Sequence, residues 1–148
     1  MKKILAVITS SLIIIGCSSN KAVDTPIDLS LLDEKNVATA QNLFRCSSFF
    51  DFVTGARKGS DDPSEHTKKT MEMASTASEI AEHILISSAE GKPINSGSLI
   101  AHFKHSGNLQ AREMVKEIGF SNDPNIISNL FQKCFKTIQR EELFDIGR

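Results

Sequence analysis

Three prolines divide most of this chain into segments of similar length. Pro63, Pro93 and Pro124 fall at near-even intervals, each beside polar residues or glycine, and a proline in that setting can open a helix. The spacing predicts four helices, without an underlying sequence repeat that would indicate a solenoid. No long stretch alternates polar and apolar residues, and Tyr and Trp are absent, so strands are not expected. We therefore predict an all-α fold, a four-helix bundle.

Apolar residues at helical spacing mark three of these helices directly. The first should cover about residues 31–58, where basic residues and a following glycine supply a stop. The second should begin with Asp62 as its cap and Pro63 in its first turn, and should end before Gly91. The fourth should follow Pro124. The three apolar faces consist of Leu43, Cys46, Phe50 and Val53; Met73, Ala77, Ile80 and Ile84; and Ile127, Leu130, Phe131, Cys134, Phe135 and Ile138.

The third segment contains residues that weaken a helix, with Gly107 near its middle. Gly97, Ser106 and Asn108 also lower helix propensity and could split the segment in two. The apolar positions nevertheless keep helical register through Gly107, which favours one helix, continuous or kinked. These positions are Ile100, Phe103, Gly107, Ala111, Met114 and Ile118.

The amino terminus has the layout of a secretory signal peptide. Lys2 and Lys3 precede a mainly apolar stretch from Ile4 to Ile15. A helix needs about 20 apolar residues to span the hydrocarbon core, so this shorter stretch is not expected to remain as a transmembrane anchor. We therefore expect residues 1–16 to be removed on export.

The stretch ends in a pattern that resembles the lipobox of bacterial lipoproteins. In the run Ile14-Ile15-Gly16-Cys17, an aliphatic residue is followed by a position that accepts many residue types, then by a small residue and the cysteine. The resemblance implies diacylglycerol on the Cys17 sulfur and an acyl chain such as palmitate on the new amino terminus. Ser18 then favours the outer membrane, with the protein facing the periplasm. Ordinary cleavage that leaves a free thiol on Cys17 is the alternative.

The lipobox also divides the chain into three parts. Residues 17–30 should be the lipidated cysteine and a polar tether, and residues 31–148 the helical domain. Removal of the two amino-terminal lysines would change the formal net charge from -1 to -3. An acidic body is repelled by an anionic membrane surface, so the lipid on Cys17 must hold the protein there.

The remaining cysteines, Cys46 and Cys134, lie on the predicted apolar faces of the first and fourth helices. An even pair in an exported chain favours a disulfide, which would brace the bundle. In the chain-entropy account such a bridge is worth about 4 kcal/mol. Two reduced core cysteines are the alternative.

No catalytic or metal-binding set stands out, and no cofactor is expected. His102 and His105 would share one helical face, but zinc needs further ligands and nothing nearby repeats the spacing. Glu79 and His83 form a second pair one turn apart, without the repeated motifs of di-iron bundles. No Gly-x-Ser-x-Gly elbow or Gly-rich phosphate loop is present.

Every aromatic residue is a phenylalanine, and three cluster at Phe49, Phe50 and Phe52. Neighbouring aromatics on a helix cannot all face one core, so Phe49 or Phe52 should contact another helix or a partner. The absence of Tyr and Trp disfavours binding to carbohydrate or single-stranded nucleic acid. A formal net charge of -1 provides no basic field for nucleic acid in general.

These observations favour a non-enzymatic interaction module of the cell envelope, held by lipid on Cys17 and binding a protein partner. In broad layout the chain is similar to small, helical, disulfide-bonded immunity proteins of type VI secretion systems. That resemblance implies a sharper role, the neutralisation of a periplasmic toxin or hydrolase. A metal-binding protein or enzyme using His102 and His105 is the alternative class. The polar loops at 59–62 and 91–97 are expected to contact the partner.

Overall fold

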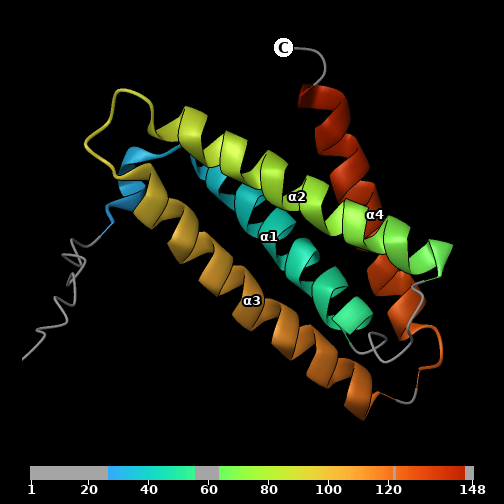
Figure 1. Ribbon diagram of the computed structural model, residues 1–148. Helices are drawn as coiled ribbons and strands as arrows, with labels where there is room; N and C mark the ends of the chain where they lie inside the picture. Colours follow the sequence, from blue (N-terminus) through green and yellow to red (C-terminus); the bar gives the residue numbers. More distant parts are fainter. Residues whose placement is uncertain (1–26, 56–63, 122, 146–148) are drawn as a thin grey trace, which may run out of the picture.

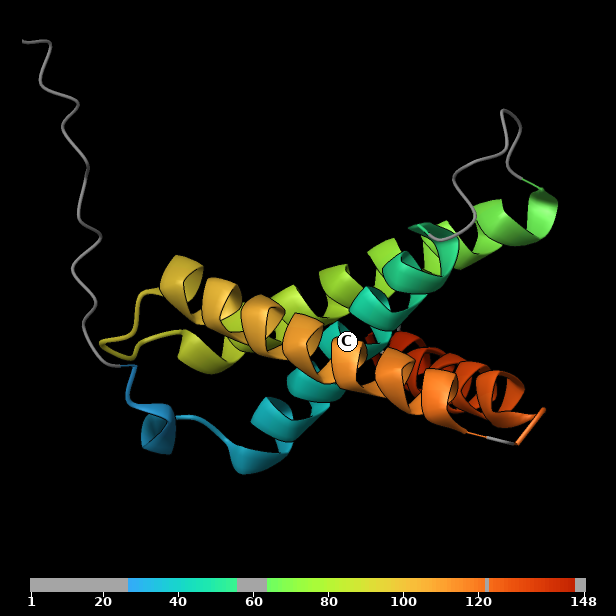
Figure 2. The same cartoon turned by 90° about the horizontal axis from the view of Figure 1, so that it is seen from below.

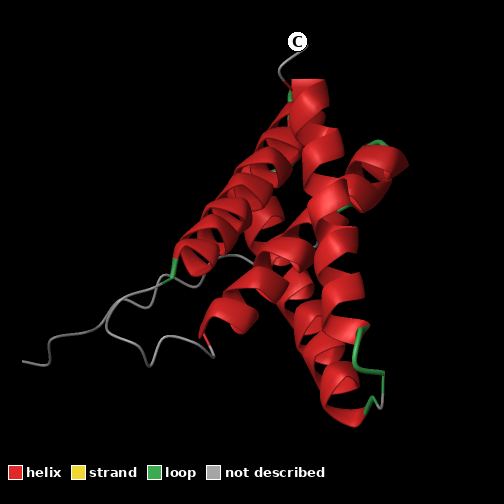
Figure 3. Ribbon diagram, turned by 90° about the vertical axis from the view of Figure 1, so that its right-hand side faces the viewer, coloured by secondary structure: helices red, strands yellow, loops and turns green. Residues whose placement is uncertain are grey.

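The computed structural model describes residues 27–55, 64–121 and 123–145, with side chains as far as Glu141. Those ranges contain four α-helices and a short 3-10 turn at Leu29–Leu31, but no strand (Figure 3). The prediction of an all-α, four-helix fold is confirmed. The predicted signal peptide, Cys17 and the loop at 59–62 lie outside the described residues. The helices are α1 (Glu34–Gly55), α2 (Glu65–Ala89), α3 (Ser96–Phe120) and α4 (Ile126–Asp145).

The central helix of the bundle is α1. On one side α2 runs antiparallel to it, on the other side α3 runs parallel to it, and α4 lies across α1 and α2 (Figures 1 and 2). A helix covered on several sides must be apolar around most of its circumference. This requirement accounts for Phe44, Phe49 and Phe50, which are buried although they project from different sides of α1.

The phenylalanine cluster is divided between two neighbouring helices. The ring centroids of Phe49 and Phe50 lie 6.1 and 4.7 Å from that of Phe131 on α4. Phe52 is half-buried, and the Arg112 guanidinium of α3 lies 5.9 Å from its ring centroid. The second contact that the sequence requires is therefore supplied by another helix of the bundle.

α3 is one continuous helix, as the register of its apolar face predicts. Gly107 lies where α3 meets α1, and a Cβ atom there would be 2.7 Å from Phe44 Cβ and 2.8 Å from the Phe44 carbonyl carbon. Ordinary carbon–carbon contacts are about 3.5–4.0 Å. Glycine therefore allows the two helices to approach this closely, and Phe103 and Ala111 are buried one turn to either side.

Polar side chains cap the starts of α2 and α3. The Asn95 side chain accepts a hydrogen bond from the backbone N–H three residues along, at 2.8 Å. Gly91, at φ 71°, supplies the left-handed turn between the two helices. α2 begins directly after Ser64, whose hydroxyl oxygen accepts a hydrogen bond from the backbone N–H three residues along, at 3.3 Å. The prediction that Asp62 caps this helix is wrong, because a cap must directly precede the first helical residue.

The folded body begins before the predicted domain boundary at residue 31. Ile27 and Leu29 pack against the core, and Asp28 caps the short turn that follows. α1 begins only at Glu34, later than the predicted start near residue 31. The last residues of the predicted tether 17–30 therefore belong to the helical body, because their apolar side chains cover the end of the core.

Cys46 and Cys134 join α1 to α4. Their Cα atoms are 5.3 Å apart and their sulfur atoms 2.12 Å apart, so the pair is at disulfide-bonding distance, as predicted. Both residues are 1% exposed. Of the side chains that the structure describes on α4, only Ile138 joins Cys134 in the fully buried core. The bridge is therefore a major part of what holds α4 to the body.

Candidate functional site

The histidines considered as metal ligands lie at exposed positions on two different helices. His102 and His105 are exposed on α3, and Glu79 and His83 are exposed on α2. No group of three or more His, Cys, Asp or Glu side chains that could hold a metal ion occurs among the described residues. The alternative of a metal centre on His102 and His105 thus gains no support from their surroundings.

The connection between α2 and α3, one of the two loops expected to contact a partner, is tied to the helices that it joins. The Lys92 backbone N–H donates to the carbonyl of Ala89 at 3.0 Å, and the Lys92 side chain donates to the carbonyl of Ser88. Ile94 is half-buried against the core. The connection lies at the same end of the body as the short turn Leu29–Leu31 and the start of α1 (Figure 1).

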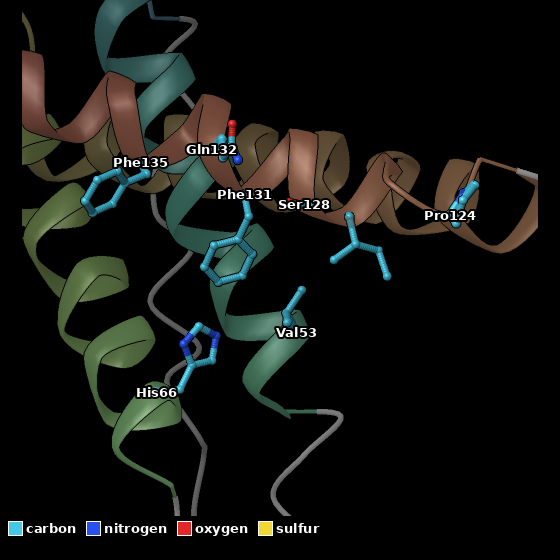
Figure 4. A pocket seen from close by; sticks show the side chains of 8 residues that line it. Val53, His66, Pro124, Ser128, Phe131, Gln132 and Phe135 are labelled. Carbon is cyan, nitrogen blue, oxygen red and sulfur yellow. The ribbon is translucent and has the colours of Figure 1, made fainter.

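A hollow opens at the opposite end, where the end of α1, the start of α2 and the first half of α4 meet (Figure 4). Its volume of about 450 Å³ falls within the range of small-ligand pockets, roughly 300–1,000 Å³. Aromatic and aliphatic side chains form most of its wall. The lining residues are Val53 from α1, His66 from α2, Pro124 from the loop before α4, and Ile127, Ser128, Phe131, Gln132 and Phe135 from α4.

Phe131 forms the inner wall of the hollow. Its ring centroid lies 4.7 Å from that of the buried Phe50 and 5.9 Å from that of His66, whose ring is inclined to it by 25°. On the outer side, Ile127 is 45% exposed and Phe135 is 41% exposed. Large apolar side chains that remain exposed together around a concave surface mark a candidate binding surface.

Ile127 and Phe135 belong to the predicted apolar face of α4, but they are exposed and not buried in the core. α4 lies across α1 and α2, so only part of its apolar face reaches the core (Figure 1). Cys134 and Ile138 are buried there, and Leu130 and Phe131 pack against the core partly buried. The apolar face of α4 is wider than its contact with the body. The periodicity identifies the face correctly, but it carries no signal for the crossing angle that leaves part of that face open.

An ion pair links α2 to α3 without lining the hollow. The Lys104 ammonium lies 2.8 Å from the Glu82 carboxylate, and its hydrogen bond lowers the pKa of Glu82 below the ordinary value. The pair joins two helices that have few other contacts with each other, so its role is structural.

Comparison with protein-family models, with curated proteins and with solved structures finds no match for the chain. Within the described ranges, no helix has the length and apolarity required to cross a membrane.

Proposed function

We propose that this protein is a lipid-anchored, non-enzymatic interaction module of the cell envelope, which binds a partner protein in the hollow between α1, α2 and α4. The observation that carries the proposal is the exposure of Ile127 and Phe135 beside a hollow of about 450 Å³. Burying each of these side chains against a partner would contribute about 1.5–3 kcal/mol if its full surface were removed from water. Because each is already more than half covered, the remaining gain is less than half of that value, about 1 kcal/mol for each side chain.

The chemistry of the lining favours binding over catalysis. His66 is the one titratable side chain among the eight lining residues, and Ser128 and Gln132 are the other polar ones. A general acid–base mechanism needs a titratable group within hydrogen-bond reach of a second reacting group. The His66 ring lies against Phe131, an apolar neighbour, so it suits packing against an apolar partner.

The anchor is proposed on the lipobox-like sequence that ends at Cys17. Mass spectrometry of the native amino terminus tests it, with a chain that starts at Cys17 and carries acyl groups as the expected result. An unmodified Cys17, or an amino terminus elsewhere, rejects the lipoprotein assignment. With Ser18 after the cysteine, we further propose the periplasmic face of the outer membrane as the location, which membrane fractionation tests.

In-cell photocrosslinking tests the binding role. A photoreactive phenylalanine analogue is placed at Ile127 or Phe135 in the full-length protein, with Leu109 as the matched control. Leu109 is 49% exposed on α3 and does not line the hollow. We expect discrete protein adducts from the two hollow positions and none from the control. Adducts to lipid alone, or the same adducts from all three positions, would reject the proposed function.

The identity of the captured protein decides whether the chain is an immunity protein. A toxin or hydrolase whose activity falls on binding would assign the sharper role. A structural envelope protein would leave the general one.

A further inference from the structure

We infer that the Cys46–Cys134 bridge is a redox switch for the hollow, so that the chain binds its partner only after these two thiols have been oxidised. The inference rests on the proposed function and adds the condition under which the same site exists. It follows from the place of the bridge on α4, from the small buried face of that helix, and from the burial of both cysteines.

The bridge lies within the stretch of α4 that forms the wall of the hollow. Cys134 directly precedes Phe135 and follows Phe131 by three residues, and both phenylalanines line the hollow (Figure 4). On α1, Cys46 lies about one helical turn before Phe50, whose ring centroid is 4.7 Å from that of Phe131. The Cα atoms of the two cysteines are 5.3 Å apart. The bridge therefore fixes how far α4 stands from α1 beside the hollow.

A small buried face holds α4 to the body. α1 and α2 have eight and nine buried residues, whereas the buried residues of α4 are Cys134 and Ile138 among the side chains that the structure describes. Burial of apolar surface is the main force that holds a helix in place, so α4 depends on the covalent bond more than α1 and α2 do. α4 also supplies five of the eight residues that line the hollow. Without the bond, α4 should leave the body and the hollow should be lost.

The two sulfur atoms must be joined before α4 docks. Both cysteines are 1% exposed in the docked arrangement, and thiol–disulfide exchange requires access to the reacting sulfur. An oxidant that carries a disulfide therefore reacts while α4 is away from the body. The docked helix then covers the bond and shields it from dithiols.

The exchange proceeds in two steps. The thiolate of one cysteine attacks the disulfide of the oxidant and forms a mixed disulfide, which releases the first thiol of the oxidant. The thiolate of the other cysteine attacks this mixed disulfide, closes the Cys46–Cys134 bond and releases the second thiol. The two cysteines lose two electrons and two protons, and the oxidant leaves as a dithiol. Binding thus begins only in an oxidising compartment, which is where the proposed export would place the chain.

Tryptophan fluorescence tests the switch without a partner, because the chain itself contains no Trp or Tyr. In full-length Phe131→Trp the single indole replaces the ring that packs on Phe50 and His66. The variant is refolded from urea in detergent, with or without dithiothreitol. We expect emission at a shorter wavelength with the bond closed, and the emission of a solvent-exposed indole in the dithiol form. Leu109→Trp, on α3 and outside the hollow, is the control and should emit alike in both forms.

In-cell photocrosslinking from Phe135 connects the switch with binding. In Cys46→Ala/Cys134→Ala the yield of protein adducts should fall at least about tenfold, because apparent affinity scales with the fraction of chains that have a complete site. Leu99→Ala is the matched control for a general loss of stability. It removes a fully buried side chain of α3 outside the hollow and leaves the bridge intact, so its adducts should remain.

Three results would overturn the inference. They are undiminished adducts from the alanine pair, the same emission of Phe131→Trp in both redox states, and a loss of far-UV circular dichroism that shows α1–α3 unfolding together with α4. In the third case the bond would hold the whole fold and not the hollow alone.

The two proposals fail separately. If photocrosslinking of the wild-type chain from Ile127 and Phe135 yields no protein adduct, the proposed function fails. Adducts that form equally well without the two cysteines would contradict only the redox switch.

Discussion

Gly107 lies where α3 crosses the central helix, and Gly107→Ala should destabilise the protein although alanine is the better helix former. The new Cβ would stand 2.7 Å from Phe44 Cβ and 2.8 Å from the Phe44 carbonyl carbon. The second of these atoms belongs to the backbone of α1, so it cannot move aside by a rotamer change. Restoring ordinary contact of about 3.5–4.0 Å requires the two helices to part by roughly 1 Å.

Two opposing effects determine the magnitude. Replacing glycine by alanine inside a helix gains about 1 kcal/mol of propensity. Overpacking a well-packed contact typically costs about 1–3 kcal/mol, and the upper part of that range applies because the obstructing atom is backbone. The free energy of unfolding should therefore fall by about 1–2 kcal/mol, which corresponds to a decrease in Tm of about 3–8 °C for a chain of this size.

Urea and thermal unfolding followed by far-UV circular dichroism measure this change, and Gly119→Ala is the matched control. Gly119 lies on the same helix, but a Cβ there would meet no atom within 4 Å. The control should be neutral or stabilised by up to about 1 kcal/mol. If Gly107→Ala proves as stable as Gly119→Ala, the close approach of α1 and α3 is not as the structure describes it.

The other stability predictions concern single links between helices. Reducing the bridge, or the double variant Cys46→Ser/Cys134→Ser, should lower the free energy of unfolding by about 4 kcal/mol. α4 should be released first, so amide hydrogen exchange should rise in α4 before it rises in α1. A uniform rise of exchange in all helices would contradict this. Asn95→Ala should cost about 1 kcal/mol of unfolding free energy in urea titrations, because the start of α3 loses its cap. Glu82→Gln should lower the free energy of unfolding by less than about 1 kcal/mol at neutral pH, since the pair with Lys104 is near the surface. Because the folded-state pKa of Glu82 is lowered, its stabilising effect is present above the ordinary pKa of a glutamate and is lost as pH falls through the folded-state value. The stabilities of wild type and Glu82→Gln, compared by urea unfolding across pH, should therefore converge in acid.

Local signals in the sequence predict most of the helical architecture. The apolar face of α3 keeps its register through Gly107, and the structure confirms one continuous helix there. Cys46 and Cys134 each lie on an apolar face, and the fold brings them to disulfide-bonding distance. Both predictions depend only on which face of a helix a residue occupies, and helical periodicity determines that well.

The errors arise where the outcome depends on how the helices are arranged. Asp62 and Ser64 are both good capping residues by type, and the structure has Ser64 as the cap of α2. Ile27 and Leu29 appear in a polar segment, but they are partly buried against the core. Sequence patterns predict neither the crossing of α4 nor, therefore, the hollow beside Phe135.

The affinity of the captured partner for defined variants tests the central claim most directly. Once photocrosslinking has identified the partner, its Kd is measured by titration calorimetry against the wild type, Phe135→Glu and Leu109→Glu, all in nanodiscs. Phe135→Glu would lose about 1 kcal/mol of remaining apolar burial and would also force a carboxylate into an apolar contact. The two costs together should reach about 2 kcal/mol or more, so Kd should rise at least about thirtyfold. Leu109→Glu should leave Kd within about twofold, as expected for a residue outside the interface. Equal affinities for the two variants would show that the partner binds elsewhere and that the hollow between α1, α2 and α4 is not its site.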